Sequence, residues 1–352
     1  MRYIIAMDSF KGSLTSEEAG KAVADNLKSH DEEAEIKVLS VSDGGEGMLD
    51  AFCKATHATR LSVPTRDALI RRIEAQYAIT PDGTAIIEVA QACGLMHIEH
   101  EQRNPMRTTS YGVGLLVADA LRHNCHKMII GLGGSATSDA GIGMLRALID
   151  TFAPEDHFNA IRPLFDNCEV ILASDVTNPL YGINGAAHVF AKQKGATSSM
   201  IEALDARAKQ FVLHTKRAMG FDKSMQPGAG AAGGLGYAFM QFLNAKMQSG
   251  AELLLHLLQF DKLLAHTDIV ITGEGKSDCQ TLMGKLPAVI MQHARQHHLP
   301  TLLLSGQIED HDSLITAGFK AACAVTPSDM PLEEAMIPEK AKANIRDFPL
   351  PI

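Results

Sequence analysis

The sequence contains no long hydrophobic run. Among its 352 residues, no apolar stretch approaches the roughly 20 residues that are needed to span a bilayer. The first ten residues, MRYIIAMDSF, hold an apolar run that is too short for a secretory signal, and no small-residue cleavage site follows it. We therefore expect no membrane partner, and we interpret these residues as the first strand of a globular domain.

Positive charge is also scarce. The chain has 32 Lys and Arg residues against 41 Asp and Glu residues, so its formal net charge is −9. This balance argues against nucleic acid or an anionic membrane as the main partner. A small anionic ligand stays compatible with the balance, because the local field of a binding site outweighs the net charge.

Closely spaced cysteine pairs are missing. The six cysteines are scattered and form no C-x-x-C motif, and they stand at positions 53, 93, 125, 168, 279 and 323. The histidines of HNCH and HH likewise lack a second ligand pair at zinc-like spacing. We therefore expect reduced thiols in a cytoplasmic protein, with neither a disulfide framework nor a zinc site.

Two common nucleotide-binding loops are absent or incomplete. The P-loop pattern G-x-x-x-x-G-K-[ST] fails at GKS (275–277), because Val270 stands where its first glycine should be. The segment PGAGAAGG (227–234) contains G-x-G-x-x-G, but it lacks the preceding apolar strand that the dinucleotide fingerprint requires. These gaps disfavour a nicotinamide-dependent oxidoreductase, and they mean that any ATP is held by other loops.

What the sequence does contain is an alternation of strand and helix patterns near both ends. This βαβα order over residues 2–56, which returns from residue 266, predicts a parallel sheet. Between them, three extended stretches, two of them joined by the turn signal PDG, predict an antiparallel meander from residue 59.

We therefore predict an α/β protein with two dissimilar domains. A discontinuous Rossmann-like parallel α/β domain comprises residues 1–58 and 266–352, and a mixed α/β domain, residues 59–265, is inserted in it. Small ligands commonly bind in clefts between domains, so we expect the active site in the cleft between these two.

Four glycine-rich segments follow predicted strands. They are DSFKGS (8–13), DGGEG (43–47), GLGGSATSDAG (131–141) and GEGKSDCQT (273–281). In an open parallel sheet such loops lie at the carboxyl ends of the strands, and a loop that leads into a helix presents free N–H groups to an anion. For any single loop, a tight turn is the alternative explanation for its glycines.

The charged residues of these loops suit phosphoryl transfer. That reaction needs carboxylates for Mg²⁺, cations and N–H groups for the phosphates, and a base for the attacking hydroxyl. The lysines available are Lys11, Lys194, Lys276 and Lys285, and the acids are Asp8, Asp43, Glu46, Asp139, Asp175, Glu274 and Asp278. Helix capping or turn stabilisation is the alternative role for each acid, most directly for Asp139 and Asp278, which stand near predicted helix starts.

Together these segments resemble the bacterial glycerate kinase family. The matching segments run in order from residue 8 to residue 285, and they include DSFKGS, DGGEG, RNPMRTTSYGVG, GLGGSATSDAGIGM, SDVTNPLYGINGAA, QKGA, PGAGAAGGLGYA and ITGEGKSDCQTLMGK. The resemblance implies two dissimilar α/β domains, one inserted in the other, with the site between them. It also implies that MgATP phosphorylates D-glycerate to 2-phosphoglycerate. The chain departs from the family between Leu148 and Asn167, where it is shorter than usual.

The loop chemistry and the resemblance give a candidate site for ATP, Mg²⁺ and D-glycerate, without separating the roles of the acids. The predicted catalytic residues are Asp43, Asp139, Asp175, Asp278 and Lys11, with Asp175 and Asp278 as the Mg²⁺ ligands. Arg107 is predicted to hold the glycerate carboxylate, because an arginine can bind a carboxylate through two hydrogen bonds. The other predicted substrate- and phosphate-binding residues are Ser9, Ser13, Gly133, Gly134, Ser135, Thr137, Gly275 and Thr281.

Two other interpretations stay open. A kinase for another small hydroxy acid would use the same chemistry with a different acceptor, and a panel of acceptors distinguishes it. A non-catalytic metabolite-binding homologue would bind its ligands without releasing ADP. The shortened segment between Leu148 and Asn167 is the feature that keeps this second interpretation open.

Overall fold

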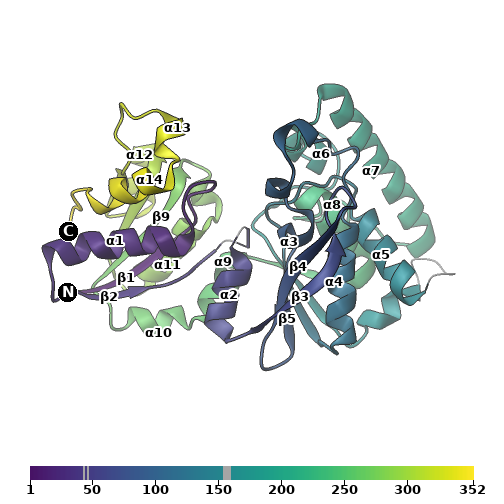
Figure 1. Cartoon of the computed structure of the whole chain (residues 1–352), viewed down its shortest axis with the longest axis horizontal. Coiled ribbons are helices and arrows are strands. Elements are labelled where there is room, and N and C mark those ends of the chain that lie inside the picture. The colour runs from purple at the N-terminus through teal and green to yellow at the C-terminus, as the bar shows by residue number, and fades with distance from the viewer. Residues whose placement is uncertain (43, 46, 154–159) are drawn as a thin grey trace. The chain divides into compact units, whose positions relative to one another are not determined.

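The computed structural model describes residues 1–42, 44, 45, 47–153 and 160–352 (Figure 1). The chain forms two compact units, of which the first comprises Met1–Asp43 and Ala251–Ile352 and the second comprises Gly44–Gly250. The first unit is therefore discontinuous in sequence, whereas the second is one continuous segment. Among the described residues, no helix combines the length and the apolar character that crossing a bilayer requires.

The first unit contains a five-stranded parallel sheet with the strand order β11-β10-β9-β1-β2. The strands are β1 (Arg2–Met7), β2 (Glu35–Val38), β9 (Ile269–Ser277), β10 (Thr301–Ile308) and β11 (Ala321–Ala324). Strand β1 is buried from Tyr3 to Met7, as expected for a central strand that is covered on both faces. The predicted parallel sheet is thus confirmed.

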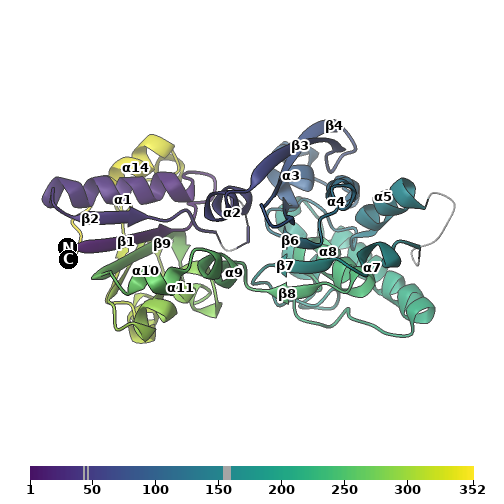
Figure 2. The same ribbon diagram turned by 90° about the horizontal axis from the view of Figure 1, so that it is seen from below.

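Helices cover both faces of this sheet. The helices of the unit are α1 (Ser16–His30), α9 (Gly250–Leu257), α10 (Phe260–Leu264), α11 (Leu286–Gln296), α12 (His311–Ala317), α13 (Leu332–Ala335) and α14 (Pro338–Arg346). Figure 2 shows α1 and α14 on one face, and α10 and α11 on the other. Helix α1 begins with a capping box, in which Thr15 and Glu18 each satisfy a backbone N–H of the other residue.

The second unit is built on a six-stranded mixed sheet with the order β3-β4-β5-β6-β7-β8. The strands are β3 (Thr59–Arg66), β4 (Arg72–Ile79), β5 (Thr84–Glu88), β6 (Lys127–Gly131), β7 (Glu169–Ala173) and β8 (Lys246–Gln248). The pairs β3–β4 and β4–β5 are antiparallel, which confirms the predicted meander. From β5 to β8 the strands run parallel.

The helices of the second unit include one directly before β6 and one directly after it. The helices are α2 (Met48–Thr56), α3 (Ala90–Cys93), α4 (Tyr111–Arg122), α5 (Ile142–Phe152), α6 (Ala186–Phe190), α7 (Ser198–Met219) and α8 (Ala231–Leu243). Helix α8 ends at Leu243, because Asn244 adopts a left-handed conformation with φ 52°. The residues that follow form β8 instead.

The chain passes between the units at 43/44 and at 250/251, earlier than the predicted boundaries at 58/59 and 265/266. Helix α2 explains the first difference, because it packs on the second unit, where the amide of Leu49 donates to the Glu88 carboxylate at 3.1 Å. Helix α9 explains the second, because Glu252 binds His293 of the first unit at 3.1 Å. The sequence pattern shows where the parallel-sheet pattern stops and resumes. The contacts of α2 and α9 show to which unit each of these connecting helices belongs.

Candidate functional site

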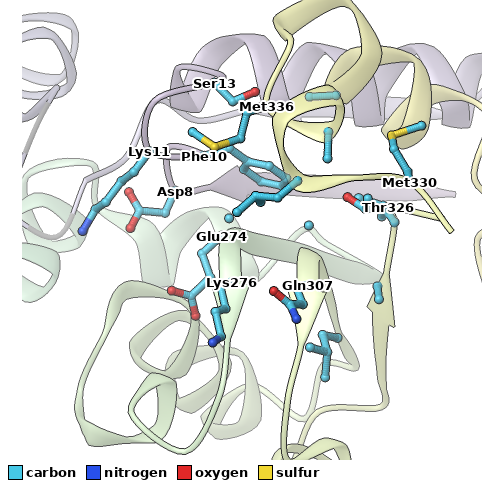
Figure 3. Close-up of a pocket in the computed structure, with 18 of the residues that line it drawn as sticks. Asp8, Phe10, Lys11, Ser13, Glu274, Lys276, Gln307, Thr326, Met330 and Met336 are labelled. Carbon is cyan, nitrogen blue, oxygen red and sulfur yellow. The ribbon is translucent and has the colours of Figure 1, made fainter. Parts of the chain in front are cut away.

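A cavity of about 870 Å³ lies in the first unit, at the carboxyl ends of its parallel strands (Figure 3). The chain leaves β1 for β2 in one direction across the sheet, and it leaves β9 for β10 and β11 in the other. The strand order therefore reverses between β1 and β9, and ligands of open α/β sheets bind in the crevice at such a point. Asp8 follows β1 and Glu274 lies near the end of β9, so both carboxylates belong to this crevice.

The lining of the cavity divides into a charged part and an apolar part. Asp8, Lys11 and Glu274 lie together on one side in Figure 3, and Lys276, Asp278 and Lys285 also line the cavity. Phe10, Val325, Met330, Leu332 and Met336 supply the apolar lining, much of it from the segment after β11. A cavity of this kind suits a ligand with an apolar body and a charged end.

Glu274 is held in place by three donors. Its Oε1 accepts from the hydroxyls of Ser277 at 2.9 Å and Thr281 at 2.6 Å, and its Oε2 accepts from Lys285 Nζ at 3.4 Å. The Thr281 hydroxyl also accepts from the amide of Asp278 at 3.1 Å. Thr281 is fully buried, so in this structure it orients Glu274 and does not face the cavity.

Asp278 stabilises a turn while it lines the cavity. Its Oδ1 accepts from the amide of Gln280 at 2.8 Å, which is the turn-forming role that the sequence left open for it.

The predicted N-terminal residues form a tight loop beside the cavity. The amides of Phe10 and Leu14 each donate to the other residue's carbonyl, at 2.9 and 3.0 Å. This closure places Lys11 at an exposed tip, and Ser9 and Ser13 also line the cavity. Gly275 lies beneath the loop, since a Cβ built on it would stand 3.4 Å from the Phe10 Cα. The structure thus brings Ser9, Lys11, Ser13 and Gly275 together.

In the second unit, the loop between β6 and α5 carries the remaining predicted glycines. The amide of Leu95 donates to the Gly134 carbonyl at 2.8 Å, and the amide of Ala136 donates to the Cys93 carbonyl at 2.8 Å. Within the described part of the chain, the amides of Gly134 and Ser135 have no acceptor. Gly134 is exposed, with φ +73°, and it therefore presents these donors in a conformation that residues with a side chain rarely adopt.

Gly133 has a different reason to be glycine. A Cβ at this position would lie 2.3 Å from the Cα of Gly45, so the two backbones could not approach each other. Close packing also explains Gly233, whose Cβ would lie 1.9 Å from the Thr137 carbonyl oxygen. The G-x-G-x-x-G segment therefore allows the start of α8 to pack on the loop before α5, and no strand leads into it.

Asp139 connects the loop to two helices. Its Oδ2 accepts from the amide and hydroxyl of Ser110 at 2.8 and 2.9 Å and from the amide of Gly143 at 3.1 Å. Its Oδ1 accepts from the amide of Gly141 at 3.1 Å. These bonds hold the starts of α4 and α5 together, so the structure gives Asp139 the capping role that the sequence allowed.

Lys194 is one of the four candidate lysines named from the sequence, and its side chain lies under this loop. Its side chain is buried, and its Nζ donates to Ser135 Oγ at 3.1 Å and to the Thr137 carbonyl at 2.7 Å. Burial lowers the pKa of Lys194 to about 8, and it raises the pKa of the neighbouring Cys93 thiol to about 12. The motif QKGA gives no sign of this burial, which depends on distant segments.

The remaining predicted residues are more open. Arg107 is exposed, and the neighbouring Thr108 hydroxyl donates to the Ala136 carbonyl at 3.0 Å, which fixes this segment on the loop. Asp175 follows β7 in the same unit. Asp43, together with Glu46, lies outside the described residues.

The described residues hold no group of three or more His, Cys, Asp or Glu side chains arranged to bind a metal. The cavity of the first unit nevertheless offers the carboxylates of Asp8, Glu274 and Asp278. Mg²⁺ is usually held by only one or two carboxylates together with substrate phosphates. The donor set therefore fits Mg²⁺ that arrives with a phosphate ligand.

Comparisons with known proteins agree on one family. The model of the glycerate kinase family matches residues 3–349. The glycerate 2-kinase of Escherichia coli (strain K12) is 36% identical, over 95% of this chain and 93% of its own length. The glycerate kinase of Halalkalibacterium halodurans is 35% identical, over 97% and 96%. The crystal structure of a protein from Salmonella typhimurium LT2, assigned as glycerate kinase 2, matches with a TM-score of 0.78 at 34% identity, over 98% of this chain and 95% of that one.

Proposed function

The chain belongs to the glycerate kinase family, and from this premise we propose that it transfers the γ-phosphoryl group of ATP to D-glycerate, giving 2-phosphoglycerate. The observation that carries the proposal is the cavity at the strand-order reversal of the first unit, with its charged and apolar parts. Phosphoryl transfer depends mainly on positioning and on stabilising charge, and both units supply groups of that kind.

We assign the nucleotide to the cavity of the first unit. Its volume of about 870 Å³ falls within the usual range for small-molecule sites. Phe10, Met330 and Met336 offer an apolar surface for the base. Lys11 and Lys285 offer cations for the phosphates, and the Lys285 amine is already oriented by Glu274.

Mg²⁺ would enter with the nucleotide. Asp278 is the predicted ligand that lines this cavity, and Asp8 and Glu274 add carboxylate oxygens there. Asp175, the other predicted ligand, belongs to the second unit. When bound, the ion would neutralise phosphate charge, while the hydrogen bonds from Ser277 and Thr281 keep Glu274 oriented.

We assign an anionic group of the substrates to the second unit. The exposed Arg107 can hold the glycerate carboxylate through two hydrogen bonds. The amides of Gly134 and Ser135 offer further donors to an anion. Because Asp139 already accepts four hydrogen bonds, we propose that it fixes the loop, and that Asp175 or Asp43 accepts the proton of the attacking hydroxyl.

The six cysteines are all free thiols, which suits a reducing compartment. We therefore place the proposed reaction in the cytoplasm.

The test is ADP release from MgATP in the presence of D-glycerate, with L-glycerate, no acceptor and EDTA as controls. We expect release that requires both D-glycerate and Mg²⁺, and phosphorus NMR of the product then locates the phosphate. Release with a different hydroxy acid would identify another acceptor. A folded protein that binds these ligands but releases no ADP would be a binding homologue, and the proposal would be wrong.

A further inference from the structure

Lys194 places a buried amine directly beneath the loop whose amides at Gly134 and Ser135 have no acceptor among the described residues. The residue is 3% exposed, and its two hydrogen-bond acceptors, Ser135 Oγ and the Thr137 carbonyl, are both neutral. Gly195, which follows it, adopts φ +90°, and a Cβ there would lie 2.3 Å from the Arg103 carbonyl oxygen. The chain is therefore tightly fixed at the point where the lysine enters the interior.

Among the described residues, the titratable groups that act on this amine do not neutralise it. Cys93, on α3, has its pKa raised to about 12 by burial and is therefore an uncharged thiol. Asp139, before α5, acts on Lys194 only through space, because its hydrogen bonds come from Ser110, Gly141 and Gly143. A buried charge without a close partner is strongly disfavoured.

The described residues supply no close counter-charge for Lys194, but they offer a place where one could bind. The Ser135 hydroxyl that accepts from Lys194 belongs to the same residue whose amide, with that of Gly134, has no acceptor among the described residues. An anion at these two amides would lie next to a hydroxyl that Lys194 polarises. The amine would then stabilise the anion through Ser135, without touching it.

We propose that Lys194 is the buried counter-charge for the anion that binds at Gly134 and Ser135, so that this anion and a proton on Lys194 bind together. The proposal rests on the proposed function, in which the anion is the carboxylate of the acceptor or a phosphate of the nucleotide. Lys194 is a positioning residue in this scheme, because it acts through Ser135 and the loop.

The coupling between anion binding and protonation of Lys194 predicts the direction in which the affinity changes with pH. Below pH 8 the amine is protonated before the anion arrives, whereas above pH 8 the free protein has lost that proton. An anion that favours the charged form raises the pKa of Lys194, so binding above pH 8 takes up a proton from solution. The affinity for the anion therefore falls by up to about tenfold for each pH unit above 8, until the pKa of the complex is reached.

Isothermal titration calorimetry of the whole protein tests the inference. Four probes are titrated separately at pH 7 and pH 9, namely D-glycerate, L-glycerate, MgADP and inorganic phosphate. At pH 9 each titration is repeated in two buffers of different ionisation enthalpy, because the difference in heat counts the protons taken up. We expect at least one probe to bind with proton uptake at pH 9 and about tenfold more weakly than at pH 7. The responding probe identifies the anion as carboxylate or phosphate.

Two variants test whether Lys194 is the group that takes up the proton. Lys194→Met should abolish the uptake and weaken binding of the same probe at pH 7 by at least about tenfold. Lys223→Met is the matched control, because Lys223 is a half-buried lysine of the same unit whose amine bonds to Asn244 at 3.3 Å. Burial also lowers the pKa of Lys223, yet this variant should retain the uptake.

The inference would be overturned by probes that bind the wild-type protein without proton uptake at pH 9. This measurement on the wild-type protein stands even if Lys194→Met does not fold. Retention of uptake and affinity in a folded Lys194→Met, or no binding of any of the four probes, would overturn it as well. The ADP-release assay on the same preparation keeps the two proposals apart. Turnover without proton-linked binding refutes this inference alone, and proton-linked phosphate binding without turnover refutes the proposed kinase.

Discussion

Each unit places a lysine at a glycine-rich loop after a strand, but the two units treat its charge in opposite ways. In the first unit, Lys285 binds Glu274, and the hydroxyls of Ser277 and Thr281 satisfy the same carboxylate. In the second unit, Lys194 is buried against neutral oxygens. The first arrangement is complete without a ligand, whereas the second leaves a charge for a ligand to compensate. Similar glycine-rich loops can therefore lie beside a lysine that is paired with a carboxylate or beside one that is not. The packing around each lysine decides between these two arrangements.

The largest effect is expected at the open loop of the second unit. Gly134→Val should reduce turnover by more than about 100-fold, because φ +73° is strained for valine and the loop amides would move away from the anion. ADP release measures the loss, and circular dichroism checks the fold. Gly220→Val is the matched control, since Gly220 also has positive φ and an added Cβ would meet no atom there within 4 Å. A folded Gly134→Val with full activity would refute an anion-binding role for this loop.

The paired site of the first unit should respond to loss of its carboxylate. Glu274→Gln removes the charge that orients Lys285, and we expect kcat/KM for MgATP to fall by about 10- to 100-fold. Glu309→Gln provides the control, because Glu309 binds Lys276 at 2.8 Å in a half-exposed pair, which contributes little. Equal kinetics in the two variants would mean that the pair formed by the buried Glu274 is no more important than the exposed pair.

The pH dependence of the free energy of unfolding should show the cost of burying the charged Lys194 amine. The folded-state pKa of Lys194 is about 8, below its ordinary value of 10.5, so between these values the unfolded chain binds more protons. The free energy of unfolding should therefore rise with pH in this window, by about 2 kcal/mol between pH 8 and 9.5. Urea unfolding of wild type and Lys194→Met at both pH values measures the difference. A parallel change in both proteins would show that Lys194 is not the group responsible.

The smallest effect concerns a paired charge of the first unit. Burial lowers the pKa of His293, but the hydrogen bonds to Asp261 at 2.8 Å and Glu252 at 3.1 Å outweigh it and raise the pKa above its ordinary value. The charged ring therefore stabilises the fold below about pH 6.5, and this contribution disappears as the pH rises through the folded-state pKa. His293→Gln should cost less than about 1 kcal/mol at pH 6, since both acids are half-exposed, and nothing at pH 9. Urea unfolding at the two pH values checks this, and an equal cost at both would indicate a packing effect.

The sequence predicts the fold well where local patterns decide it. The capping box of Thr15 and Glu18 and the turn at Gly83 follow from residue chemistry over a few positions, and both occur in the structure. The orientation and burial of the side chains at the candidate sites are harder to predict. Thr281 turns its hydroxyl inward to Glu274, and nothing in GEGKSDCQT distinguishes that from a phosphate contact. Lys194 is buried only because segments near residues 93, 103 and 135 meet around it.

The discontinuity of the first unit also sets an order of events during synthesis. Tyr3 pairs with Ile269, so the central strand β1 leaves the ribosome long before its neighbour β9 exists. The second unit is one continuous segment, Gly44–Gly250, and its sheet can assemble while β1 has β2 as a neighbour but still lacks β9. The nucleotide cavity proposed here is finished last, because Met330 and Met336 lie beyond the last strand of the sheet. A nascent chain therefore acquires the loop around Ser135 before it acquires the cavity proposed for the nucleotide.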